Sequence, residues 1–178
     1  MAQIWLGHGA WGSPATMDPW VEGLRIRGLD AAAVALPRGR ADRGIAPFAA
    51  QVPDAAGMVV GGHSLGGRVA SLLAAGVHGV PVREHAVVGV VALSFPLHPP
   101  RRPDPMLARA AHFPSIRVPV LLLAGDADPY ARLDLLREAV ALLPRAELVV
   151  YPGVGHDLAP VRDDALGRIA AFVGALPG

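Results

Sequence analysis

Hydrophobic residues gather in six short runs along this chain, and Val, Ile, Leu and Ala dominate them. Each run is continuous rather than alternating between apolar and polar positions, which is typical of strands buried on both faces of a parallel sheet. The pattern therefore predicts six strands, in the runs QIWL (residues 3–6), AAAVAL (31–36), GMVVG (57–61), VVGVVALS (87–94), VPVLLLAG (118–125) and AELVVY (146–151).

Stretches with the apolar spacing of amphipathic helices lie between these runs. Three of them have apolar faces formed by Leu65, Val69, Leu72 and Gly76, by Leu133, Leu136, Val140 and Leu143, and by Leu166, Ile169, Val173 and Leu176. Strands that alternate with helices form right-handed βαβ units around a parallel sheet. We therefore expect a doubly wound α/β sandwich of three layers, with helices on both faces of the sheet.

A further helix is predicted in DPWVEGLRIRG, residues 18–28, with Asp18 as N-cap, Pro19 as first residue and Gly28 beyond its end. The less regular regions are residues 37–56 and 95–117, and the prolines of the second region exclude a central strand there. Without a repeat or a linker, the 178 residues are expected to form a single domain, residues 1–178.

Composition narrows the possible partners. The net charge is only +1, and nothing in the sequence resembles the concentrated basic face of nucleic-acid-binding proteins. We therefore expect no nucleic-acid partner. All basic residues are arginine. Those at positions 38, 40, 101 and 102 could meet an anionic substrate, although solvated surface charge is the simpler interpretation.

The chain contains no cysteine, which excludes disulfides, thiolate metal sites and a cysteine nucleophile. The first residues lack the pattern of a signal peptide, and no segment reaches the roughly 18 uninterrupted apolar residues of a membrane span. We therefore expect a cytoplasmic protein without a membrane partner, in which any covalent chemistry uses oxygen or nitrogen.

The most informative motif is Gly62-His63-Ser64-Leu65-Gly66, a G-x-S-x-G sequence at the transition from a predicted strand to a predicted helix. This pattern is typical of a nucleophile elbow, in which a strained turn lifts a serine hydroxyl above the sheet. Its glycines are needed because bulkier residues would collide with adjacent elements. Ser64 is therefore a candidate nucleophile, and the alternative interpretation is a glycine-rich structural turn.

A serine nucleophile needs a base and a carboxylate that orients the base, and both follow later strands. His156 lies in a glycine-flanked loop after the sixth strand, and the fifth strand leads into Asp126 and Asp128. Asp128 is the preferred carboxylate because Asp126 directly abuts the strand. Either aspartate could instead cap the following helix, and Asp157 is a poorer candidate because it would have to orient its sequence neighbour.

Two backbone N–H groups are expected to stabilise an oxyanion. One belongs to Leu65, and the other to Ala10 or Trp11 in the loop LGHGAWGSP, with Ala10 preferred and His8 bracing the loop. For substrate binding the candidates are Trp11, which either walls an acyl pocket or covers the core, and His98 in the proline-rich region. His63 is expected to have a structural role.

The chain resembles the α/β-hydrolase superfamily, and within it the small, capless, dienelactone-hydrolase-like group that includes KANSL-type proteins. The resemblance rests on HGAWGSP, GGHSLGGRVAS, LSFPLHPPRRPD, PVLLLAGDADPY and GVGHDL. It implies a minimal six-stranded sheet of order 2-1-3-4-5-6, and catalytic roles for Ser64, Asp128 and His156. Dienelactone hydrolases use a cysteine nucleophile, so their particular activity is not expected from a chain without cysteine.

The candidate residues predict a serine hydrolase of carboxylic esters or thioesters that needs no metal or organic cofactor. Small acyl substrates are expected because residues 95–117 are too short to form a separate cap domain. A different class remains open, because some KANSL-type relatives act in protein assemblies: a non-catalytic fold that binds another protein. Acyl transfer to peroxide at the same site is a third possibility. A metal-dependent hydrolase that uses His8, His63, His156 and Asp126 is the least favoured, since their spacing matches no standard metal motif.

Overall fold

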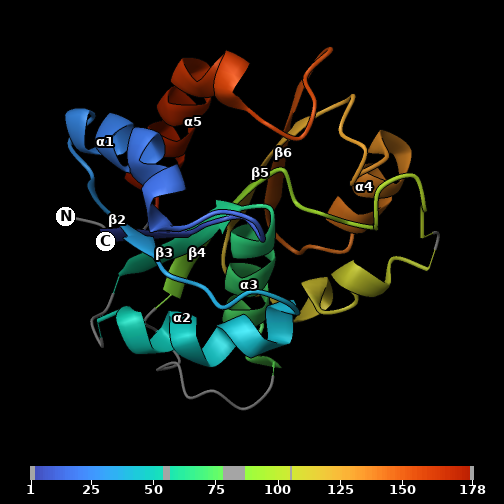
Figure 1. Cartoon of the computed structure of the whole chain (residues 1–178), viewed down its shortest axis with the longest axis horizontal. Helices are drawn as coiled ribbons and strands as arrows, with labels where there is room; N and C mark the ends of the chain where they lie inside the picture. The colour runs from blue at the N-terminus through green and yellow to red at the C-terminus, as the bar shows by residue number, and fades with distance from the viewer. Residues whose placement is uncertain (1–2, 54–56, 78–86, 105, 177–178) are drawn as a thin grey trace.

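The computed structural model describes residues 3–53, 57–77, 87–104 and 106–176. Within these ranges, six parallel strands form one sheet in the order β2-β1-β3-β4-β5-β6, which confirms the predicted order (Figure 1). From β1 the chain adds β2 on one side of the sheet, and from β3 onward it adds strands on the other side, so the strand order reverses between β1 and β3. In such sheets ligands bind at the carboxyl ends of the strands near this reversal. The strands are β1 (Gln3–Gly7), β2 (Asp30–Val34), β3 (Met58–His63), β4 (Val87–Leu93), β5 (Val120–Gly125) and β6 (Ala146–Tyr151).

Helices cover both faces of the sheet (Figure 1). On one face lie α1 (Asp18–Ile26) and α5 (Arg162–Gly174), and on the other lie α2 (Ile45–Gln51), α3 (Leu65–Ala74) and α4 (Leu133–Val140). Short 3-10 turns complete the described chain: η1 (Pro14–Met17), η2 (Ala41–Gly44), η4 (Ala108–Ala110), η5 (Phe113–Ser115) and η6 (Ala159–Val161).

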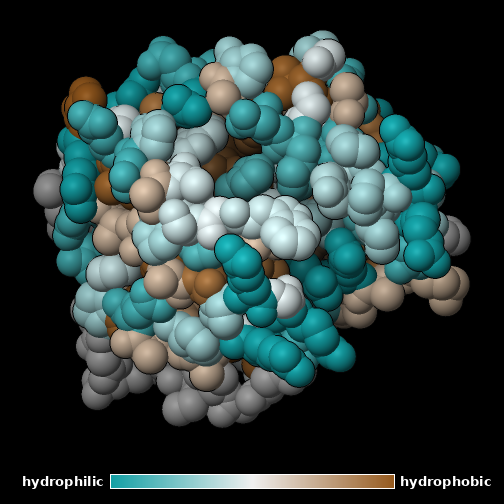
Figure 2. Space-filling view, viewed as in Figure 1, coloured by the Kyte–Doolittle hydropathy of each residue, from teal (hydrophilic) through white to brown (hydrophobic). Residues whose placement is uncertain are grey.

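Two hydrophobic cores lie on opposite faces of the sheet, and successive strand residues alternate between them. Val60 and Leu122 belong to the core under α2, α3 and α4, whereas Val59 and Leu121 belong to the core under α1 and α5. Both faces are therefore apolar, which explains why the strand sequences are continuous hydrophobic runs. On the face seen in Figure 2, by contrast, the surface is largely hydrophilic to intermediate, and strongly hydrophobic residues are visible only in small patches.

The described part of residues 37–56 is more regular than the sequence predicts, because it contains η2 and α2. Ile45 and Phe48, three positions apart, are fully buried against the sheet. Pro47 is the third residue of α2, where the missing N–H removes no helical hydrogen bond. A helix of this length offers too few apolar positions to show a helical period.

The predicted start of α1 is also wrong in detail. The helix begins at Asp18 with Met17 as its N-cap, and no side chain caps it. The reason is that η1 runs directly into α1, so the chain is already in helical conformation before Asp18. The predicted end is confirmed, since Gly28 follows the helix with a φ of 83°.

The proline-rich region is irregular, as predicted. The described residues of 95–117 contain only the short turns η4 and η5. Across the described ranges, none of the helices combines the length and the apolar character that crossing a lipid bilayer would require.

The burial of Phe48 gives a test of α2. Replacing Phe48 with Ala should lower the free energy of unfolding by about 3–5 kcal/mol, since it removes a fully buried ring and leaves a cavity. Urea-induced unfolding measures this change. Ile26, which is 77% exposed, provides the matched control, because Ile26→Ala should change stability by about 0.5 kcal/mol or less. Equal effects of the two variants would contradict the packing of α2.

Candidate active site

Ser64 lies in the turn between β3 and α3, with backbone angles φ 51° and ψ −110°. A positive φ is uncommon for a residue with a side chain, and such strain persists only where the surroundings impose it. The Ser64 N–H donates a hydrogen bond of 2.8 Å to the carbonyl of Leu93 at the end of β4, and α3 begins at the next residue. The turn therefore has the geometry of a nucleophile elbow.

The glycines around Ser64 allow a very close backbone approach. A Cβ added at Gly62 or at Gly66 would overlap the backbone of Gly7 at the end of β1. Gly62 also has a φ of 150°, which side-chain-bearing residues rarely adopt. Three glycines from two strands and a helix thus let the β3–α3 turn sit directly against β1.

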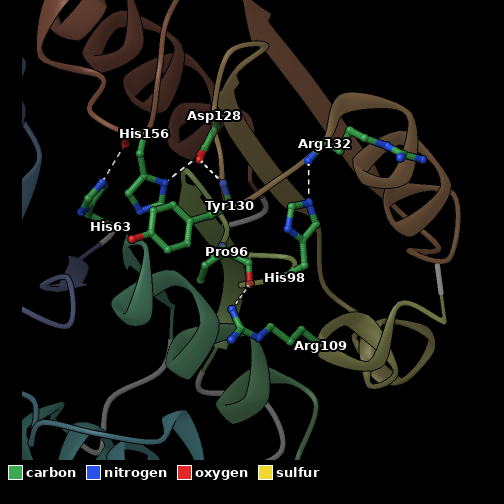
Figure 3. A network of polar contacts seen from close by, with 8 residues as sticks. All are labelled: His63, Pro96, His98, Arg109, Asp128, Tyr130, Arg132 and His156. Atoms are coloured by element: carbon green, nitrogen blue, oxygen red, sulfur yellow. Dashed lines mark hydrogen bonds and ion pairs between the residues drawn. The ribbon is translucent and has the colours of Figure 1, made fainter. Parts of the chain in front are cut away.

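Asp128 and His156 form the hydrogen-bonded pair that the sequence predicts. The His156 Nδ1–H donates to Asp128 Oδ2 over 2.7 Å, and the Asp128 side chain is fully buried (Figure 3). The second Asp128 oxygen accepts the N–H of Tyr130 over 2.8 Å, so both carboxylate oxygens are satisfied. This arrangement fixes the imidazole orientation and leaves Nε2 as the nitrogen available for proton transfer.

The other two candidate carboxylates have different partners. Asp126 accepts the N–H of Gly153 over 2.7 Å and so joins the loops after β5 and β6. Asp157 is exposed and accepts the N–H of Ala159 over 2.9 Å. Of the three candidate carboxylates, Asp128 is therefore the one that bonds to His156.

Ser64 and His156 line the same cavity, which has a volume of about 300 Å³. Among the described residues, no hydrogen bond joins the Ser64 hydroxyl to the His156 ring. Such bonds are often long in proteins without substrate and shorten when substrate binds. The lining consists of Gly9, Ala10, Trp11, Gly12, Thr16, His63, Ser64, Tyr130 and His156.

His63 supports His156 from the β3 side. Its Nε2–H donates to the backbone carbonyl of His156 over 3.0 Å, and the two ring centroids are 5.0 Å apart (Figure 3). Burial lowers the pKa of His63 below its usual value of 6.5, so the ring is neutral at pH 7. His63 therefore fastens the loop after β6 to β3, which confirms its expected structural role.

The loop after β1 supplies the remaining wall of the cavity. His8 donates from Nδ1 to the carbonyl of Gly9 over 2.7 Å and accepts the N–H of Leu36 at Nε2 over 3.0 Å, which confirms that it braces this loop. Within the described ranges, the amide N–H groups of Ala10 and Leu65 donate no hydrogen bond. Both groups remain available to a ligand in the cavity.

The two predicted substrate-binding residues differ. Trp11 is 89% exposed and lines the cavity, so it does not cover the core. His98 does not line the cavity, and the prediction that it faces the pocket is corrected. It is 2% exposed and donates from Nδ1 to the carbonyl of Pro99. At Nε2 it accepts the N–H of Arg132 (Figure 3). Both ring nitrogens are therefore occupied, and the bond at Nε2 holds the proline-rich region to the loop after β5.

Tyr130 is a residue that the sequence analysis missed. Its ring centroid lies 4.4 Å from that of His156, and it lines the cavity beside Ser64. The sequence feature that could have indicated Tyr130 is its position two residues after Asp128. An aspartate that accepts the N–H of the second following residue turns the chain, and this turn brings that residue back to the site.

The four residues of the metal alternative are not brought together. His8 uses both ring nitrogens in backbone hydrogen bonds, and Asp126 bonds to Gly153 rather than to a histidine. Among the residues that the structure describes, no group of three His, Asp or Glu side chains is arranged to hold a metal ion.

Solved structures share this fold. A monoacylglycerol lipase from Paleococcus ferrophilus superposes with a TM-score of 0.80 at 17% identity, over 96% of this chain and 93% of that one. An esterase from Pyrococcus furiosus gives 0.75 at 18% identity, over 99% of this chain and 81% of that one. An esterase from Thermogutta terrifontis gives 0.71 at 18% identity, over 98% and 82%. At these identities the similarity concerns the fold alone.

The sheet order, the strained serine turn and these superpositions define an α/β-hydrolase fold. A family model described as an alpha/beta hydrolase domain matches residues 40–170, well over half of the chain. The chain therefore belongs to the α/β hydrolase domain family. No curated protein sequence shows a significant match to it.

The contact between α3 and β1 gives a direct test. Gly66→Ala should lower the free energy of unfolding by about 1–3 kcal/mol, because the added methyl group overlaps the backbone of Gly7. Helix propensity alone would give the opposite sign, since Ala stabilises a helix by about 1 kcal/mol relative to Gly. Gly167→Ala in α5 is the control, because its Cβ meets nothing within 4 Å and the variant should be stabilised. Urea-induced unfolding measures both changes. If both variants have a higher free energy of unfolding than wild type, the backbones of Gly66 and Gly7 are not in close contact.

Proposed function

We propose that this protein is a serine hydrolase of carboxylic esters or thioesters, with Ser64 as nucleophile, His156 as general base and Asp128 as the residue that orients it. The observation that carries the proposal is the short bond between His156 Nδ1 and Asp128 Oδ2, on the same cavity as a serine with positive φ. The solved structures that share this fold include two named esterases and a monoacylglycerol lipase, and this similarity supports the same class of substrate.

The proposed reaction has two acyl-transfer steps. The Ser64 hydroxyl attacks the carbonyl carbon while His156 Nε2 takes its proton, and the imidazolium then protonates the leaving alcohol or thiol. Water, deprotonated by His156, attacks the acyl-enzyme and releases the acid. Throughout, Asp128 stabilises the imidazolium by its bond to Nδ1 and remains ionised.

The developing oxyanion is stabilised by backbone amides. Leu65 provides the first N–H at the start of α3, where the helix dipole also favours negative charge. Ala10 provides the second, with Trp11 as the alternative, and both residues line the cavity. The donors of Ala10 and Trp11 are fixed before substrate binds, because His8 holds the loop after β1 to the backbone after β2.

Within the family, we assign the chain to the small dienelactone-hydrolase-like and KANSL-type group, on the motifs HGAWGSP and GGHSLGGRVAS and the SFPLHPP stretch. The proposed substrate is a small acyl ester, since a cavity of about 300 Å³ is at the lower end of the range for ligand sites.

Matched aspartate variants test the proposed site. Asp128→Asn should lower kcat/KM for p-nitrophenyl acetate by on the order of 10³- to 10⁴-fold, because the amide no longer favours the required imidazole tautomer. Asp126→Asn is the control, since an amide oxygen can still accept the N–H of Gly153, and its activity should stay within a few-fold of wild type. Equal losses in both variants would contradict the assignment of Asp128.

Covalent labelling distinguishes an enzyme from a binding module. A fluorophosphonate should label the wild-type protein, and Ser64→Ala should abolish the labelling, as measured by intact-protein mass spectrometry. If the wild type is not labelled while remaining folded, the non-catalytic alternative holds. Comparing hydrolysis with acyl transfer to peroxide in the unlabelled wild-type enzyme separates the two catalytic alternatives.

Chain length tests the size of the site. Among p-nitrophenyl esters of increasing acyl length, kcat/KM should be highest for acetate to butyrate and fall for long chains, because the cavity holds few carbon atoms. Activity confined to long-chain esters would contradict the proposed substrate class without affecting the roles of Ser64 and His156.

A further inference from the structure

A second cavity adjoins the one that contains Ser64. It has a volume of about 250 Å³ and shares two lining residues, Thr16 and His63, with the first. A ligand that extends from Ser64 past His63 would enter this space. The other lining residues are Met17, Trp20, Asp157 and Arg162.

Arg162 brings a positive charge to this second cavity. Its guanidinium carbon lies 5.6 Å from the centroid of the Trp20 ring, a distance at which a cation is attracted to an aromatic face. The Trp20 side chain is almost fully buried and so is a rigid support. Within the described ranges, the Nε–H of Arg162 is buried and has no hydrogen-bond partner.

The carboxylates nearest to Arg162 in the sequence are engaged elsewhere. Asp163 pairs with Arg27 over 2.5 Å, and Asp164 pairs with Arg168 over 2.8 Å. Asp157, at the exposed edge of the cavity, accepts a backbone N–H instead of pairing with Arg162. Arg162 therefore forms no ion pair with the acidic side chains that the structure describes, and Asp157 is the acidic residue that lines the same cavity.

We propose that the second cavity is a subsite for a carboxylate of the substrate, bound by Arg162. The planar guanidinium presents N–H groups in a fork that matches the two oxygens of a carboxylate. The terminal Nη groups of Arg162 donate no hydrogen bond to the described residues, so they are the donors that a carboxylate in the cavity would meet. The substrate class is then an ester or thioester of a dicarboxylic acid, or one with an acidic leaving group. This inference rests on the proposed function for its turnover test, but not for its binding test.

The turnover test compares two esters that differ in one charge. Wild-type protein should hydrolyse monomethyl succinate with a higher kcat/KM than dimethyl succinate, measured by acid release in a pH-stat. Arg162→Gln should lower the ratio of the two values by about 10- to 100-fold, the range expected for a charge-assisted hydrogen bond. Arg162→Lys should retain part of the preference, because it keeps the charge but loses the fork.

Two further variants make the test specific. Asp157→Asn should raise the ratio by roughly 2- to 5-fold, since it removes a like charge at the exposed edge and its amide oxygen can keep the bond to Ala159. Arg137→Gln removes one positive charge from an exposed position on α4 and should leave the ratio unchanged. If Arg162→Gln and Arg137→Gln change the ratio equally, the effect is one of net charge and the proposal is wrong.

The binding test is independent of catalysis. In the Ser64→Ala variant, an NMR titration should show tighter binding of monomethyl succinate than of dimethyl succinate, and the added Arg162→Gln change should remove the difference. If the fluorophosphonate does not label folded wild type but this difference in binding is present, the proposed function fails and the carboxylate subsite stands. Equal binding of the two esters by a folded Ser64→Ala protein overturns the subsite.

Discussion

The structure depends on one close contact, the approach of the β3–α3 turn to the end of β1. Gly62 and Gly66 lie so near to the backbone of Gly7 that none of the three positions can accept a side chain without movement. The contact fixes where α3 begins relative to the sheet. Because Ser64 is the residue between strand and helix, the same contact imposes its positive φ and directs its hydroxyl into the cavity. The contact that packs α3 against the sheet therefore also fixes the geometry of the candidate site.

The remaining parts of the site are joined by hydrogen bonds between loops. His63 holds the loop after β6, and His98 connects the proline-rich region to the start of α4 (Figure 3). Asp126 joins the loop after β6 to the one after β5. Each bond uses at least one backbone group. The carboxyl edge of the sheet is consequently a connected frame, and the pair formed by Asp128 and His156 is one bond within it. Such a frame fixes polar groups before substrate binds, which is the condition for electrostatic stabilisation of a transition state.

Much of this arrangement can be predicted from the sequence, because it follows from local patterns. The six hydrophobic runs give the strands to within a few residues, and the G-x-S-x-G motif gives the strained turn. Chain order after the fifth and sixth strands gives the pairing of Asp128 with His156. Helix α2 could not be predicted, because it is held by the contact of Phe48 with the sheet rather than by its own periodicity.

The misplacement of His98 has a different cause. The position of its ring depends on how two loops, 34 residues apart at His98 and Arg132, fold over one another. A histidine in a proline-rich loop has the same sequence signature whether its ring faces a cavity or bonds to backbone. Which of these two environments the ring has depends on whether the N–H of Arg132 lies within hydrogen-bond distance of it. No local sequence pattern encodes that distance. The second cavity is hidden for the same reason, since Trp20 and Arg162 come from distant helices.

The bond from His63 to the backbone carbonyl of His156 also bears on how this site can evolve. A carbonyl belongs to every residue, so the anchor does not depend on which side chains surround it in the loop after β6. Neighbouring positions in that loop, including Asp157, are free to change without displacing the imidazole. Selection can thus vary the charge and shape next to the nucleophile while the position of the base is inherited unchanged.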